Sequence, residues 1–148
     1  MKTPVFVTLV VFSVVAVDQA TKHLVMAFLP LHESREVLPF LHIVHFRNTG
    51  AAFGMFRGMG STYFVLLSLV AIVFIVYLLK KKAYNAFGLS LVLGGALGNL
   101  IDRVLYGNVV DFIDFFIGSF HWPAFNVADS SLTVGIAIIV IRHLLGKK

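Results

Sequence analysis

The segment Ser61–Leu79, STYFVLLSLVAIVFIVYLL, decides the fold class of this chain. It contains no charged residue and ends directly at Lys80, Lys81 and Lys82. A helix rises about 1.5 Å per residue, so about 20 apolar residues cross the ~30 Å hydrocarbon core of a bilayer. The segment therefore predicts a transmembrane helix that ends at a cationic boundary.

Three further apolar stretches have a similar length, and they cover residues 4–29, 84–105 and 125–145. Hydrophobic residues make up 59% of the chain and charged residues only 13%, against about 25% charged in soluble domains. We therefore expect an α-helical membrane protein whose residues 1–148 form a single membrane domain with four transmembrane helices, at about 4–29, 61–79, 84–105 and 125–145. A cleaved signal peptide at the N-terminus is a weaker interpretation, because the apolar stretch continues past Lys22.

The distribution of Lys and Arg predicts the orientation, since loops on the cytoplasmic side carry the excess of these residues. Seven of the 12 fall in the two tails and in the short loop after residue 79, and five are spread over the other two loops. Both termini are therefore expected to be cytoplasmic, and the net charge of +5 reflects topology and not a nucleic-acid partner. All seven acidic residues fall on the opposite, outer half, where we expect any chemistry to occur.

The two outer loops, residues 30–60 and 106–124, differ in pattern. The first contains a β-like run, Leu41–Arg47, followed by the turn residues Asn-Thr-Gly, and it predicts a small sheet on the membrane surface. The second mixes aromatic residues with two aspartates. Because amphipathic rings are enriched at the membrane–water interface, we expect this second segment to be an interfacial loop.

Two groups of polar residues interrupt the expected helices. Asp18 and Lys22 are spaced i, i+4 on one face, which favours a structural salt bridge. Asn99, Asp102 and Arg103 lie within about one turn, just after a G-x-x-x-G motif that permits close helix packing. Asn99 and Asp102 should point into the bundle, where the group either forms a structural network or positions a substrate.

The remaining aspartates lie near the start of the fourth expected helix and in the second outer loop. Asn126 and Asp129 have the spacing of a helix N-cap followed by an acid in the first turn. Asp111 and Asp114 are flanked by apolar and aromatic residues, which would desolvate one of them and raise its pKa. We expect at least one of these two to face water. Two carboxylates brought close together share a proton and can act as acid and base on a water molecule.

Other site classes fit less well. The chain has no cysteine, which excludes disulfides, thiolate metal sites and a cysteine nucleophile. His42 and His45 would face opposite sides of a strand, so no histidine spacing fits a metal site, and no cofactor is expected. A small transporter or channel subunit would hold its acid near mid-membrane between minimal loops. A purely structural assembly protein would leave the desolvated acids unexplained.

These residues together resemble one known family. The chain resembles lipoprotein signal peptidase, also called signal peptidase II, the aspartic protease of bacterial membranes, over essentially its whole length. The resemblance rests on five blocks in order, namely Asp18-Gln-Ala-Thr-Lys22, Asn48-Thr-Gly-Ala-Ala-Phe53, Gly94-Gly-Ala-Leu-Gly-Asn99-Leu-Ile-Asp102-Arg103, Val109-Val-Asp111-Phe112 and Phe125-Asn126-Val-Ala-Asp129.

The resemblance implies roles for these residues. Asp111 and Asp129 would be the catalytic pair, with Asp114 as a bystander. The first outer loop would form the β-cradle of the family. Residues that would orient the substrate or the carboxylates are Asn48, Asn99, Arg103 and Asn126, and residues that would support the site are Asp18, Lys22 and Asp102.

The resemblance also implies a substrate and a location. Substrates would be prolipoproteins that carry a diacylglyceryl group on a cysteine, cleaved just before that cysteine. The enzyme would be a multi-pass protein of the bacterial cytoplasmic membrane, active at its outer face and sensitive to globomycin-type inhibitors. It would need no metal and no cofactor, and we expect a monomer.

Overall fold

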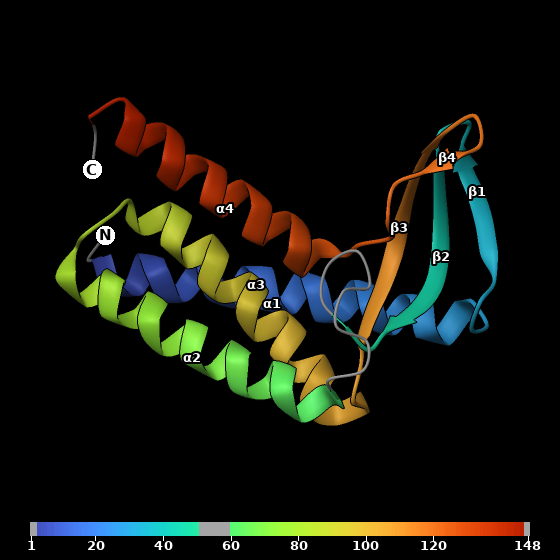
Figure 1. Ribbon diagram of the computed structural model, residues 1–148, viewed down its shortest axis with the longest axis horizontal. Helices are drawn as coiled ribbons and strands as arrows, with labels where there is room; N and C mark the ends of the chain where they lie inside the picture. The colour runs from blue at the N-terminus through green and yellow to red at the C-terminus, as the bar shows by residue number, and fades with distance from the viewer. Residues whose placement is uncertain (1–2, 51–59, 147–148) are drawn as a thin grey trace.

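The computed structural model describes residues 3–50 and 60–146 and contains four long helices (Figure 1). They are α1 (Thr3–Phe28), α2 (Gly60–Lys81), α3 (Ala86–Tyr106) and α4 (Val127–Leu144). Each is long and apolar enough to cross a membrane, which confirms the prediction of four spans, and each begins and ends within two residues of the predicted bounds. Their outward faces carry exposed hydrophobic side chains, such as Phe12, Val70 and Leu144. Such surfaces suit contact with lipid and not with water.

Helix α3 lies at the centre of the bundle and packs against α1, α2 and α4. The G-x-x-x-G glycines make the contact with α1 close. A Cβ on Gly94 would lie 2.8 Å from Cβ of Val14 in α1, and one on Gly98 would lie 2.7 Å from a carboxylate oxygen of Asp18. On the other side, a Cβ on Gly95 would collide with the carbonyl oxygen of Ala128 in α4.

We predict that Gly95→Ala lowers stability by about 1–3 kcal/mol, as overpacking does elsewhere. The added methyl group must push α4 away from α3, because the atom that it meets belongs to the backbone. Thermal unfolding of the purified protein in detergent measures the loss. Leu105→Ala, at an exposed position of the same helix, is the control. Equal melting temperatures for Gly95→Ala and the unmodified chain would contradict the close packing.

A four-stranded antiparallel sheet lies at one end of the bundle. Its strands follow the order β1 (Ser34–Leu38), β2 (Leu41–Asn48), β3 (Val109–Ile117) and β4 (Phe120–His121). The predicted sheet in the first outer loop is thus confirmed. Residues 51–59 lie outside the described residues, and they include the end of the block Asn48-Thr-Gly-Ala-Ala-Phe53. The prediction of an interfacial loop at residues 106–124 is wrong, because these residues supply two strands of the same sheet. Most of β3 is buried on both faces, so it lacks the alternation that marks a half-exposed strand.

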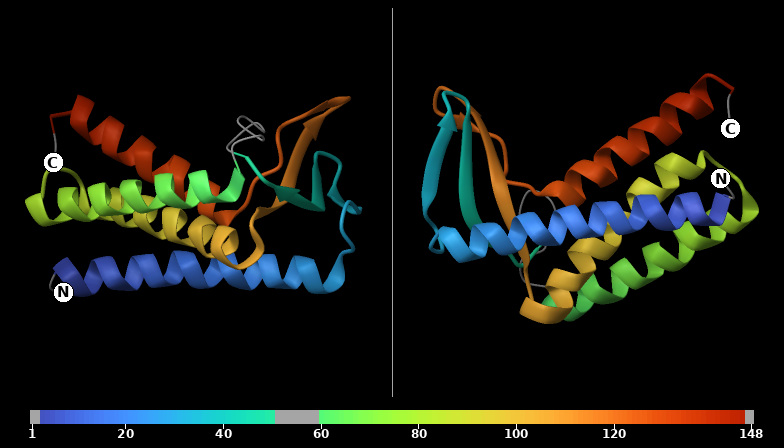
Figure 2. Two further views of the ribbon diagram at one scale, coloured as in Figure 1. Left: turned by 60° about the horizontal axis from the view of Figure 1, so that its bottom comes forward. Right: turned by 180° about the vertical axis from the view of Figure 1, so that it is seen from behind.

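The sheet positions the segments that flank the helices. Gly107, with φ at 71°, ends α3 in the left-handed conformation and turns the chain directly into β3. Strand β4 leads back to the start of α4 through residues 122–126. The first turn of α1 and the last turn of α4 lie at the same end of the bundle, away from the sheet (Figures 1 and 2). The predicted site residues of α3, β3 and the start of α4 therefore lie where the helices join the sheet.

Candidate active site

Asp111 and Asp129 line the same cavity, which has a volume of about 770 Å³. Asp111 lies on β3 and is 4% exposed, and Asp129 lies in the first turn of α4. Two further elements contribute polar side chains to the lining, namely β2 with Asn48 and α3 with Asn99 and Arg103. The structure thus brings together the two predicted catalytic residues, although their roles stay a prediction.

Asn126 joins the two aspartates through its single side-chain amide. Its Oδ1 accepts a hydrogen bond of 2.9 Å from the backbone N–H of Asp129, which is the predicted N-cap of α4. This fixes the amide orientation, so Nδ2 faces Asp111 and donates to its Oδ1 at 2.8 Å. The buried amide therefore sets the distance between strand β3 and the first turn of α4.

Two further amides each hold one of the carboxylates. Asn48 donates from Nδ2 to Oδ2 of Asp111 at 3.1 Å, and Asn99 donates from Nδ2 to Oδ1 of Asp129 at 2.8 Å. Amide donors of this kind fix carboxylate positions without adding a charge to the site. Each aspartate is thus oriented by side chains from other elements.

Burial, followed by the nearby charge of Asp129, raises the pKa of Asp111 to about 7. Hydrogen bonds from Asn48 and Asn126 and the charge of Lys22 oppose this shift. Near neutral pH Asp111 is therefore partly protonated, beside a second carboxyl group. Such a pair can accept a proton from water and donate one to a carbonyl oxygen.

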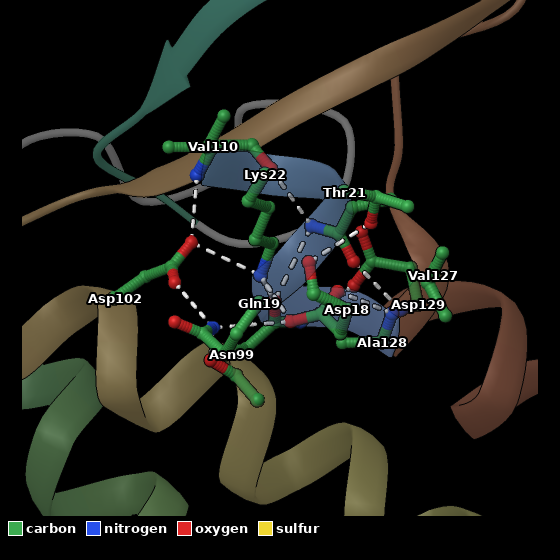
Figure 3. Close-up of polar contacts among 12 residues, drawn as sticks. Asp18, Gln19, Thr21, Lys22, Asn99, Asp102, Val110, Val127, Ala128 and Asp129 are labelled. Atoms are coloured by element: carbon green, nitrogen blue, oxygen red, sulfur yellow. Dashed lines mark hydrogen bonds and ion pairs between the residues drawn. The ribbon is translucent and has the colours of Figure 1, made fainter. Parts of the chain in front are cut away.

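Behind the cavity, Lys22 lies buried between three oxygen atoms (Figure 3). Its Nζ is 2.8 Å from Oδ2 of Asp18, 3.0 Å from Oδ2 of Asp102 and 3.0 Å from Oδ1 of Asn99. The predicted Asp18–Lys22 pair is confirmed, and Asn99 and Asp102 point into the bundle as expected. Because Lys22 donates to the Oδ1 of Asn99, the Nδ2 of that amide is left to face Asp129.

The two acids of this cluster also hold the backbone beside the predicted catalytic residues. Asp18 Oδ1 accepts from the N–H of Ala128, directly before Asp129, at 2.8 Å. Asp102 Oδ2 accepts from the N–H of Val110, directly before Asp111, at 3.0 Å. Lys22 therefore holds two carboxylates, and each carboxylate anchors the residue that precedes one aspartate of the pair.

Gln19 belongs to this cluster and was not among the predicted site residues. Its Nε2 donates to Oδ1 of Asp102 at 2.8 Å and to the carbonyl oxygen of Gly98 at 3.2 Å. The sequence signals for it were its polarity within an apolar helix and its place in the block Asp18-Gln-Ala-Thr-Lys22.

Arg103 enters the cavity from the last turn of α3. Its Nη2 donates to the carbonyl oxygen of Gly50 at 3.4 Å, and its guanidinium lies 5.4 Å from the ring centre of Phe64. The guanidinium is thus held between the end of β2 and the start of α2.

Asp114 corrects the expectation that one aspartate of the second loop faces water. It is 6% exposed and lies on the face of β3 opposite to Asp111. Its Oδ2 is 2.9 Å from Nδ1 of His121 and 3.5 Å from Nδ1 of His42. Asp114 is therefore buried, but it contacts a different group of residues from the pair.

Over residues 3–50 and 60–146, no three His, Asp or Glu side chains lie in a group that could hold a metal ion. The described side-chain hydrogen bonds to the aspartate pair come instead from the amides of Asn48, Asn99 and Asn126.

Comparison with known proteins identifies the family. A sequence profile described as Signal peptidase (SPase) II matches residues 10–145. The chain belongs to the signal peptidase II family. This confirms the predicted resemblance and identifies the chain as a protease.

Relatives of this signal peptidase II family member match along most of their length. A lipoprotein signal peptidase of Thermodesulfovibrio yellowstonii is 47% identical over 134 residues, which cover 90% of this chain and 91% of the relative. One of Staphylococcus aureus strain MRSA252 is 43% identical over 140 residues, which cover 92% and 86%. A solved structure described as a bacterial membrane enzyme at 2.3 Å resolution has a TM-score of 0.87 at 42% identity, covering 94% of this chain and 87% of that one. The fold of four membrane-spanning helices and a small sheet is thereby confirmed.

Proposed function

We propose that this chain is an intramembrane aspartic endopeptidase that removes the signal peptide from diacylglyceryl-modified prolipoproteins. The cut would fall just before the lipid-bearing cysteine. The observation that carries the proposal is the pair Asp111 and Asp129 in one cavity, joined through the amide of Asn126. The names of the relatives, lipoprotein signal peptidase, support the substrate class.

The proposed mechanism divides the two proton transfers between the aspartates. Because the pKa of Asp111 is about 7, we assign the shared proton to Asp111 and the role of base to Asp129. Asp129 takes a proton from a water molecule, whose oxygen attacks the scissile carbonyl carbon while Asp111 protonates the carbonyl oxygen. As the tetrahedral intermediate collapses, one of its hydroxyl groups returns a proton to Asp111, the C–N bond breaks and the proton held by Asp129 passes to the leaving amine of the cysteine. Asn48, Asn99 and Asn126 would keep the two carboxylates oriented, and Arg103 would hold the peptide backbone next to the pair.

The proposed orientation in the membrane follows the positive-inside rule. Lys80 and Lys81 end α2 at the same end of the bundle as the start of α1 and the end of α4. This end would face the cytoplasm, with both termini. The cavity at the sheet end would then lie at the outer face, where a lipid-anchored substrate places its cleavage site. We propose a chain that acts as a monomer in the bacterial cytoplasmic membrane, is inhibited by globomycin-type peptides and needs neither a metal nor a cofactor.

We predict that the activity falls on the alkaline side of pH 7. As the pH rises through the pKa of Asp111, the acid loses its proton, both carboxylates become charged and no proton donor remains. kcat/KM should then decline by about tenfold per pH unit. Rates measured between pH 6 and 9 in one detergent check this, and a rate that still rises above pH 8 would contradict it.

The requirement for the lipid tests the proposed function itself. The purified chain in detergent is incubated with one preprotein in two forms, with and without the diacylglyceryl group on its cysteine. We expect cleavage of the lipid-modified form only. Equal cleavage of both forms, or of neither, would reject the proposed substrate class.

A further inference from the structure

A second cavity, of about 460 Å³, adjoins the catalytic one on the sheet. The two cavities have Trp122 and Phe125 in their linings in common, so they are neighbours and share one wall. The catalytic cavity contains carboxylates, amides and a guanidinium, whereas the described lining of the second contains only hydrophobic side chains. We call this second cavity the aromatic groove, and its lining includes Phe40, Phe115, Ile117, Phe120, Trp122 and Phe125.

The groove extends away from the catalytic pair along β3. Asp111 and Phe115 are four residues apart, so they lie on the same face of the strand and about 13 Å from each other. Ile117, at the end of the strand, lies about 20 Å from Asp111. Asp114 and its two histidine partners occupy the opposite face. Figure 2 shows this β3–β4 hairpin projecting from the bundle beside the start of α4.

The walls of the groove are ordered by ring contacts, and its rim is exposed. The ring of Phe115 stacks between those of Phe40 and Phe125, with centroids 6.4 Å and 5.9 Å apart. At the rim, Ile117 is 84% and Phe120 is 65% exposed. A contiguous apolar surface of this kind outside the helices marks a site for a lipid or another apolar ligand.

Resting on the proposed function, we propose that the aromatic groove binds one acyl chain of the diacylglyceryl group on the substrate. The lipid-bearing cysteine directly follows the scissile bond, so its acyl chains begin next to Asp111 and Asp129. A chain that leaves this point meets the shared wall of Trp122 and Phe125 and then the hydrophobic groove. Continuity with the catalytic cavity is what favours the acyl chain of the substrate over the bulk lipid of the outer leaflet.

The test compares one variant with the unmodified chain on two substrates that differ in acyl-chain length. Phe120→Ser removes an exposed rim side chain without touching the catalytic cavity. Lipopeptides that carry two palmitoyl chains or two butanoyl chains are cleaved by both proteins in the same detergent. We expect Phe120→Ser to raise KM for the palmitoyl substrate by about tenfold and to leave KM for the butanoyl substrate unchanged. Val37→Ser, at an exposed hydrophobic position outside the groove lining, should change neither value.

A binding measurement keeps this inference separate from the proposed function. A palmitoyl substrate with a photoreactive diazirine near the chain end is irradiated with the Asp129→Asn variant, and the labelled peptide is identified by mass spectrometry. Labelling within residues 115–125 supports the groove. Labelling of the helices alone, or equal KM increases for both chain lengths in Phe120→Ser, would overturn it while cleavage by the unmodified chain still supports the proposed function. An unmodified chain that cleaves neither lipopeptide would instead reject the proposed function.

Discussion

Asp111→Asn and Asp129→Asn are each expected to abolish cleavage of a lipid-modified preprotein, with a loss of about three orders of magnitude or more. Asparagine keeps the size of the side chain but can neither hold the acidic proton nor accept one from water. Asn126 and Asn99 would still contact the substituted positions, so the fold around the cavity should persist. Initial cleavage rates of the purified variants in detergent measure the loss.

Asp114→Asn is the matched control for these two variants. It makes the same chemical change on the same strand as Asp111, at a buried aspartate that points to the opposite face. We expect this variant to retain most of the activity. Full activity in either Asp111→Asn or Asp129→Asn would contradict the assignment of the pair. An inactive but folded Asp114→Asn would show that the cluster with His42 and His121 is also required.

Lys22→Met is expected to destabilise the fold by about 3–5 kcal/mol, since it removes the cation from a buried ion pair. Asp18 and Asp102 would each lose an Nζ contact of 2.8 or 3.0 Å while remaining buried. The same two carboxylates hold the N–H groups of Ala128 and Val110, so the loss should reach both aspartates of the pair. Thermal unfolding in detergent gives the change in stability.

Two comparisons separate charge from packing in this experiment. Lys81→Met removes a cation from the exposed end of α2 and should change stability by less than about 0.5 kcal/mol. Adding Asp18→Asn and Asp102→Asn to Lys22→Met removes the unpaired charges, and part of the stability should return. A Lys22→Met protein as stable as Lys81→Met would contradict the structural role of the buried cation.

The helices could be predicted from the sequence because each is a property of one segment. An uncharged stretch as long as a bilayer is thick needs no partner to be identified, and the Asp18–Lys22 pair follows from helical spacing alone. Strand β3 is different, because it pairs with β2, from which α2 and α3 separate it in the sequence. Asn48 and Val109 are neighbours only through this pairing. Its apolar run with two aspartates resembled an interfacial loop because both faces are buried and the alternation of a strand is missing.

The site was predictable in its residue types but not in its connections. The N-cap of α4 is local, so the role of Asn126 toward Asp129 could be expected from a spacing of three residues. Its second bond, to Asp111, depends on where the sheet places β3. Likewise, the contact of Lys22 with Asp102 joins α1 to α3, and Gln19 enters the cluster through the same helix contact. Such contacts follow from packing and have no signature within a single segment.

The position of the cut tests the central claim most directly. The purified chain is incubated in detergent and EDTA with a diacylglyceryl-modified preprotein, and both products are analysed by intact mass. Two aspartates acting on water at the outer end of the bundle predict a mature fragment that begins with the lipid-bearing cysteine, formed at the same rate with and without EDTA. No cleavage, a cut at any other bond, or loss of activity in EDTA would contradict the account.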